Sequence, residues 1–198
     1  MKRVVALLIA MVAFSGMASA QNLGQLLKGV VTEYIDEKTD GKVSEFLLAG
    51  EWNYSSPCIR LESENELAAL AGNAAASTLK SKLSTAYSYV GIKAGSHSLK
   101  LNNDDTFSMV VGKRTYTGTY TYNSETHAIE LKFTTTLLKL SPLSGYAYVN
   151  GDTLDVAYDC TKLVNFLSSL GSNVSMLNSI TQLVSNYDNV HIGFTYSK

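Results

Sequence analysis

Histidines are the side chains best suited to move a proton near neutral pH, and the chain carries three, His97, His127 and His191. General acid–base catalysis needs a partner that orients the imidazole within hydrogen-bond reach. No acidic residue or cysteine stands at metal-ligand spacing from any of them. His127 begins an expected strand, and His191 alternates with its apolar neighbours. We therefore predict that the histidines face solvent and that none is catalytic.

Acidic residues gather in two places, and both clusters have a structural explanation. Residues 102–105 read Asn-Asn-Asp-Asp, which lacks the spacing and the terminal glutamate of a calcium loop. Such residues favour turns because they bond their own backbone. Glu66 lies three residues after Ser63, which predicts a helix-capping box. Nucleophile elbows and phosphate-binding loops are absent from the sequence. We predict no catalytic residue, metal or cofactor, and so no enzyme.

Two cysteines, Cys58 and Cys160, could form a disulfide if the chain reaches an oxidising compartment. The bridge would close a loop of about 100 residues and add roughly 4 kcal/mol of stability in the chain-entropy model. Two separate buried thiols are the alternative, since sequence separation says nothing about distance in space. The sequence leaves both alternatives open.

Aromatic residues follow a period of two between Leu99 and Phe133, which is typical of half-buried antiparallel strands. Candidate residues for the lining of a ligand cavity are Trp52, Phe107, Met109, Tyr116, Tyr120, Tyr122, Phe133 and Phe194. Aromatic rings with phenol hydroxyls could orient a small ligand. They could equally fill the core, or lie outside beneath helices, because an eight-stranded barrel is barely wider than its own side chains.

The elements that position these residues are short strands separated by turns. We predict strands at Gly50–Leu61, near Leu99 and Phe107, and at Arg114–Tyr122, His127–Thr135, Gly145–Asn150, Thr153–Asp159 and 190–197. Helices are expected over 23–35, at about 64–90, and in two pieces between 162 and 187. Pro57 predicts a bulge or an unpaired position in the first strand. The last strand should close against the strand of Trp52, which gives an antiparallel up-and-down barrel of about eight strands, mainly β.

The first twenty residues have the pattern of an export signal. Lys2 and Arg3 precede an apolar run that ends in Ala18-Ser19-Ala20. We predict that residues 1–20 are removed and that residues 21–198 form one domain, with a helical segment at 21–47. The remainder carries 14 basic and 17 acidic residues, without a basic patch, so no nucleic-acid partner is expected. No later apolar run predicts a membrane span. The expected location is the periplasm, the cell envelope or the exterior.

Several short motifs resemble those of lipocalins. Gly50-Glu51-Trp52 matches the Gly-x-Trp opening of the first lipocalin strand, and Leu101–Phe107 followed by Gly118-Thr119-Tyr120 resembles a hairpin of exported lipocalin-like domains. With its helical segments, the chain is most similar, over residues 47–198, to a secreted Bacteroidetes lipocalin-like family of unassigned function. Lipocalins commonly place an arginine of the last strand over the tryptophan, and residues 190–197 contain none. The resemblance implies a small apolar ligand and no catalytic residue.

Two functional hypotheses follow. The first is an exported binding protein that holds a small apolar or amphipathic molecule inside the barrel. The second is a non-enzymatic module of the cell envelope with a filled barrel, which binds a partner protein through a helix face or a strand edge. The volume of the barrel interior distinguishes them.

Overall fold

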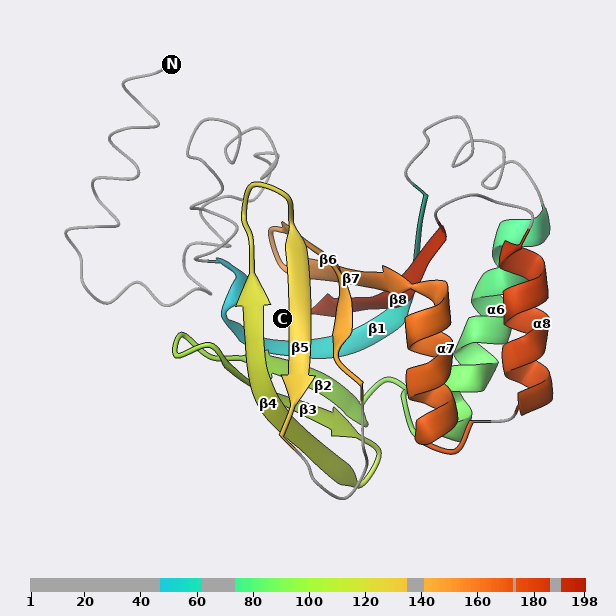
Figure 1. Ribbon diagram of the computed structural model, residues 1–198, viewed down its shortest axis with the longest axis horizontal. Helices are drawn as coiled ribbons and strands as arrows, with labels where there is room; N and C mark the ends of the chain where they lie inside the picture. Colours follow the sequence, from blue (N-terminus) through green and yellow to red (C-terminus); the bar gives the residue numbers. More distant parts are fainter. Residues whose placement is uncertain (1–46, 62–73, 135–140, 173, 186–189) are drawn as a thin grey trace, which may run out of the picture.

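A computed structural model describes residues 47–61, 74–134, 141–172, 174–185 and 190–198 (Figure 1). Eight antiparallel strands follow one another in sequence order around a closed barrel. The strands are β1 (Gly50–Leu61), β2 (His97–Leu101), β3 (Thr106–Val111), β4 (Arg114–Tyr122), β5 (Ala128–Phe133), β6 (Leu143–Asn150), β7 (Thr153–Asp159) and β8 (Val190–Ser197). The predicted fold class is confirmed, including the pairing of the first strand with the last.

Strand β1 closes the barrel by pairing with two neighbours in succession. Its first part pairs with β2 from Gly50 to Asn53, and its remainder pairs with β8 from Asn53 to Leu61. The register shifts between Tyr54 and Ser56. We expected an irregularity at Pro57, but Pro57 keeps its place opposite Phe194, and the bulge lies just before it. A proline lacks only the N–H donor, so it can occupy a position in which that donor is not needed.

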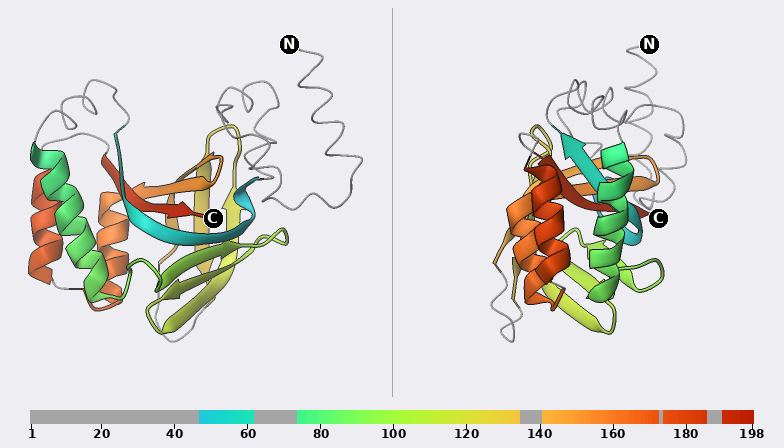
Figure 2. Two further views of the ribbon diagram at one scale, coloured as in Figure 1. Left: turned by 180° about the vertical axis from the view of Figure 1, so that it is seen from behind. Right: turned by 90° about the vertical axis from the view of Figure 1, so that its right-hand side faces the viewer.

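Three described helices gather at one end of the barrel (Figures 1 and 2). They are α6 (Ala74–Tyr89), α7 (Cys160–Ser169) and α8 (Val174–Val184). Helix α7 begins where β7 ends, and the Asp159 carboxylate caps it by accepting from the Lys162 amide at 3.0 Å. Leu83 of α6, Leu163 of α7 and Ile180 of α8 are fully buried. The apolar faces of the helices therefore extend the barrel core beyond the strand ends.

Two glycines allow β6, β7 and β8 to approach closely. A Cβ atom at Gly193 would overlap the Val156 carbonyl oxygen, and one at Gly145 would overlap the Ala157 carbonyl oxygen. Both overlaps are with backbone, which cannot rotate away. Glycine is therefore needed at these two positions, because there is no space for a Cβ atom.

Several expectations concern residues outside those described. They are the export signal over 1–20, the helical segment up to residue 46, the capping box at Ser63 and the first part of the helix expected at 64–90. Within the described part of the chain, no helix is long and apolar enough to cross a membrane.

Candidate functional site

The structure buries most of the predicted lining residues completely. Phe107, Met109, Tyr116 and Tyr120 are at most 7% exposed, and Trp52 and Phe194 are 0% exposed. Tyr122 and Phe133 are half-buried and pack against the same core cluster. The eight residues thus lie in one core cluster or pack against it, although whether they hold a ligand stays a prediction.

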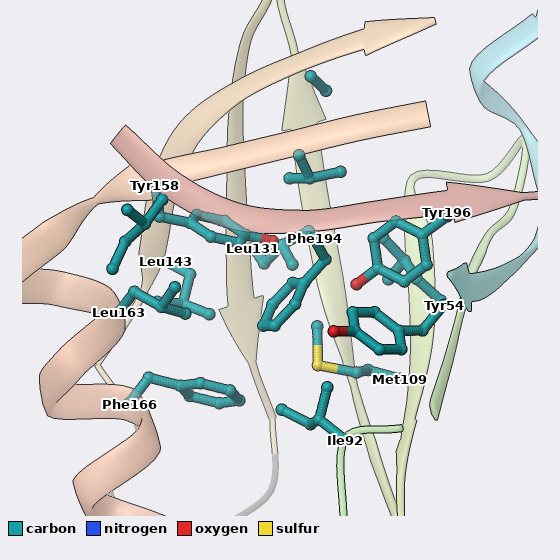
Figure 3. Close-up of a cluster of buried hydrophobic side chains, with 14 of the residues drawn as sticks. Tyr54, Ile92, Met109, Leu131, Leu143, Tyr158, Leu163, Phe166, Phe194 and Tyr196 are labelled. Atoms are coloured by element: carbon teal, nitrogen blue, oxygen red, sulfur yellow. The ribbon is translucent and has the colours of Figure 1, made fainter. Parts of the chain in front are cut away.

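Side chains from opposite walls meet in the middle of this interior (Figure 3). Tyr54, Met109 and Phe194 point toward one another there, and the Tyr54 and Phe194 ring centroids are 6.1 Å apart. Leu163 and Phe166 enter from α7 at the helix-covered end, where the Phe166 ring stacks on Phe133 at 5.6 Å. These contacts fill the barrel from within.

One histidine prediction is wrong. His97 is only 2% exposed, because β2 turns its first side chain inward among the rings of Phe194 and Tyr196. The carbonyl oxygen of Val110 can only accept, so His97 Nδ1 donates to it at 2.6 Å, and His97 Nε2 accepts from the Tyr196 hydroxyl at 3.0 Å. Burial lowers the pKa of His97 from 6.5 to about 4. His97 is therefore a neutral core residue.

Among the described residues, buried tyrosine hydroxyls are satisfied by hydrogen bonds, with one exception. Tyr87 of α6 donates to the Gly193 carbonyl oxygen at 3.0 Å, and Tyr120 donates to the Asn102 carbonyl oxygen at 2.9 Å. The Tyr158 hydroxyl is also buried, but it makes no hydrogen bond to any described residue. Burial raises the pKa of Tyr158 well above its usual value, so the hydroxyl is protonated and can donate.

The end opposite the helices is closed around Trp52. The indole N–H donates to the Leu48 carbonyl oxygen at 2.8 Å. Lys198 places its ammonium group 4.4 Å from the centroid of the Trp52 ring, and it donates to the Leu47 carbonyl oxygen at 3.2 Å. A lysine one residue beyond the last strand thus covers the tryptophan in the absence of an arginine. Sequence analysis missed it by considering only residues 190–197.

The cross-link between Cys58 and Cys160 is not formed, and both thiols are free and buried. Cys58 and Ala157 lie opposite Gly193 on its two sides, so they are two strand spacings apart, roughly 9.6 Å. Cys160 lies three residues beyond Ala157 and starts α7. A disulfide needs Cα atoms within about 7 Å, which this register does not favour. Burial raises the pKa of Cys58 to about 12 and that of Cys160 to about 11.

A groove of about 500 Å³ opens on the outside of the barrel where β5 and β6 meet the start of α7. We call it the β6 groove. Its lining consists of Thr121, Tyr122, Asn123, Ala128, Ile129, Glu130, Ser144, Gly145, Tyr146, Asp159, Lys162 and His191. The Glu130 carboxylate accepts from Lys132 Nζ at 2.9 Å and from the Ser144 hydroxyl at 3.4 Å. The Lys132 bond in particular holds the pKa of Glu130 below its usual value, so the groove contains a carboxylate.

Four half-buried rings continue from this groove across the outer face. This outer aromatic strip consists of His191, Tyr146, Tyr148 and His127. Ring centroids are 5.1 Å apart for Tyr146 and His191, 6.4 Å for Tyr146 and Tyr148, and 4.8 Å for His127 and Tyr148. The Arg60 guanidinium carbon lies 3.6 Å from the Tyr148 ring centroid. Sequence analysis missed the strip, although Tyr146 and Tyr148 alternate with the inward Ala147 and Val149.

Within the described part of the chain, no three His, Cys, Asp or Glu side chains are grouped as a metal site would require. The arrangement thus offers two environments for binding: a filled apolar interior, and an outer groove with rings and hydrogen-bonding groups of both charges.

A comparison with known protein families agrees with the observed barrel. The family described as Lipocalin-like domain (DUF4923) matches residues 23–198, which include all eight strands. Among solved structures, the chain is similar to a DUF4847 family protein from Bacteroides vulgatus ATCC 8482. That likeness has 12% sequence identity, covers 78% of this chain and 96% of that chain, and has a TM-score of 0.36. No curated protein matches the chain.

Proposed function

The chain belongs to the lipocalin-like domain family DUF4923, and from this premise we propose that it is a non-catalytic binding protein that uses the outside of a filled barrel. The packed interior is the observation that supports this proposal. Trp52, Met109 and Phe194 have 0% exposed surface, so no water-sized space adjoins them. An apolar ligand could enter only by displacing well-packed core side chains, which costs free energy.

The place of action is part of the same proposal. The export signal expected at residues 1–20 would deliver the domain to the periplasm or the cell surface. A closed barrel suits such a setting, because each strand has a neighbour on both sides and little edge is left for aggregation. The partner would be a molecule encountered outside the cytoplasm.

Ligand binding to the interior provides the test. Wild-type protein should bind neither palmitate, by native mass spectrometry, nor benzene, by calorimetric titration. The variant Phe194→Ala should gain benzene binding, because removal of a buried ring leaves an apolar void, and an engineered void of about 150 Å³ in another protein binds benzene. Met109→Ala is a second cavity variant in case the first does not fold. A stoichiometric palmitate complex of the wild type would overturn the proposal.

A second candidate function, an interior site for a small ligand, is favoured by the unpaired hydroxyl of Tyr158. A buried hydroxyl without a partner costs about 1–3 kcal/mol, and a ligand oxygen or a water molecule would remove that cost. If the interior is empty of both, Tyr158→Phe should stabilise the fold, whereas Tyr87→Phe should destabilise it by losing the bond to the Gly193 carbonyl oxygen. Urea denaturation measures both changes. Destabilisation by Tyr158→Phe would show that the hydroxyl has a partner, and a bound small molecule in the native mass spectrum of the wild type would identify that partner as a ligand rather than water.

A further inference from the structure

We infer that the β6 groove and the outer aromatic strip together form a carbohydrate-binding site for a neutral oligosaccharide. This inference rests on the proposed function, because the oligosaccharide would be the molecule that binds the outside of the barrel. The groove volume of about 500 Å³ lies within the range of small-molecule sites, about 300–1,000 Å³, and would suit a di- or trisaccharide.

The rings of the strip supply the apolar part of such a site. One face of a pyranose ring presents C–H bonds, which pack against the electron-rich face of an aromatic ring. Tyr146 lies where the groove and the strip meet, with the His191 ring perpendicular to it at 5.1 Å. Tyr148 extends the strip away from the groove, but the Arg60 guanidinium carbon lies 3.6 Å from its ring centroid and covers one face, so Tyr146 is the ring offered for stacking. The rings are thus held in position before a ligand arrives, which limits the entropy lost on binding.

The polar groups of the groove suit hydroxyls. Glu130 has a third of its side-chain surface exposed while Lys132 and Ser144 fix its carboxylate. Asp159 is held at the opposite side by its bond to the backbone of α7, and Lys162 lies beside it. A sugar hydroxyl both donates and accepts, so it can bond carboxylates and an ammonium group together.

The charge balance and the topology argue against other ligand classes. The two carboxylates of the groove, Glu130 and Asp159, are matched in number by Lys132 and Lys162, so the groove has no excess positive charge that would favour a phosphorylated or otherwise anionic ligand. An extended peptide usually adds a strand to a free sheet edge, but beneath the groove β5 and β6 already pair with each other, from Ala128 to Leu131 on β5. A neutral polyhydroxylated ligand can pack its C–H bonds on the rings and hydrogen-bond through its hydroxyls to both the carboxylates and the ammonium groups.

Titration of isotope-labelled wild-type protein with maltotriose, cellotriose, xylotriose, mannotriose and chitotriose tests the inference by amide chemical shifts. At least one trisaccharide should bind and shift the amides of Ser144, Gly145 and Lys162. Tyr146→Ala should weaken that binding about tenfold, since one stacked ring is lost. Tyr89→Ala, on an exposed ring of α6, should leave the affinity unchanged.

The outcomes separate this inference from the function on which it rests. If no trisaccharide binds and the interior also rejects palmitate and benzene, the carbohydrate inference fails while the exterior-binding proposal stands. If palmitate occupies the wild-type interior, the proposed function fails. Saccharide binding that shifts amides far from the groove, or that survives Tyr146→Ala unchanged in a folded variant, overturns the site assignment.

Discussion

Protonation of His97 should make the barrel sensitive to mild acid. The folded-state pKa of about 4 lies below the unfolded-state value of 6.5, because burial among the rings of Phe194 and Tyr196 disfavours the charged imidazole. The unfolded chain therefore binds a proton at a pH where the folded chain does not. The resulting stability is fully present above pH 6.5 and is lost as the pH falls toward 4.

The magnitude follows from linkage. With these two pKa values, His97 alone should lower the free energy of unfolding by about 2 kcal/mol between pH 8 and pH 5, and by about 3 kcal/mol at pH 4. This is a large fraction of the stability of a typical domain, about 5–15 kcal/mol. Carboxylates such as Glu130 also lose stabilising contacts in acid, so the contribution of His97 must be isolated by comparison with a variant.

Urea denaturation of the wild type and of His97→Gln at several pH values is the assay. His97→Gln should be less stable at pH 8, because it disrupts the bonds to Val110 and Tyr196, but its stability should fall less steeply toward pH 5. His127→Gln, which removes a half-buried imidazole outside this ring cluster, is the matched control for the substitution. Wild-type and His97→Gln curves that stay parallel within about 0.5 kcal/mol from pH 8 to pH 5 would refute the reasoning.

Three further expectations concern packing and closure. Gly193→Ala should destabilise the fold by about 3 kcal/mol or more, because the new Cβ atom would overlap the backbone of β7. The control Gly95→Ala has open space around it and should cost only about 1–2 kcal/mol, because its φ is positive. Equal thermal denaturation midpoints for the two variants would contradict this expectation. Lys198→Met should lower the free energy of unfolding by about 1 kcal/mol, because it removes the cation from the Trp52 ring and the hydrogen bond to the Leu47 carbonyl oxygen. Lys100→Met, on the exposed face of β2, is the control in the same urea titration. An equal decrease in both variants would argue against the contact between Lys198 and Trp52. Cys58 and Cys160 should react only slowly with a thiol reagent at pH 8 in the native protein, because both are buried. In urea both should react rapidly without prior reduction, because both are free thiols. A requirement for a reducing agent would reveal a disulfide.

The fold was predictable because alternation and turn residues are local signals. Arg114–Tyr122 and Thr153–Asp159 match observed strands residue for residue, and the lipocalin-like tryptophan located the start of β1. Closure was also predictable, since a final alternating strand such as 190–197 must pair with some partner.

Contacts between distant residues were not predictable in the same way. His97 was assigned to solvent because no local pattern shows that β2 begins beneath the rings of β8. The approach of Lys198 to Trp52 depends on how the ends of two strands meet across the barrel. The groove around Tyr146 likewise depends on where α7 starts relative to β5, and periodicity within one segment carries no such information.

The seam between β1 and β8 has a consequence for how the chain reaches its native state. The partners Asn53 and Ser197 lie at nearly opposite ends of the described sequence, and β1 has only four residues of ladder with β2. Most of β1 therefore lacks its partner until β8 is available to pair with it. Topologies dominated by pairings between residues distant in sequence fold slowly, and their unpaired strands are exposed to aggregation until they pair. We therefore expect closure of the barrel to be a late step that depends on the eight residues of β8.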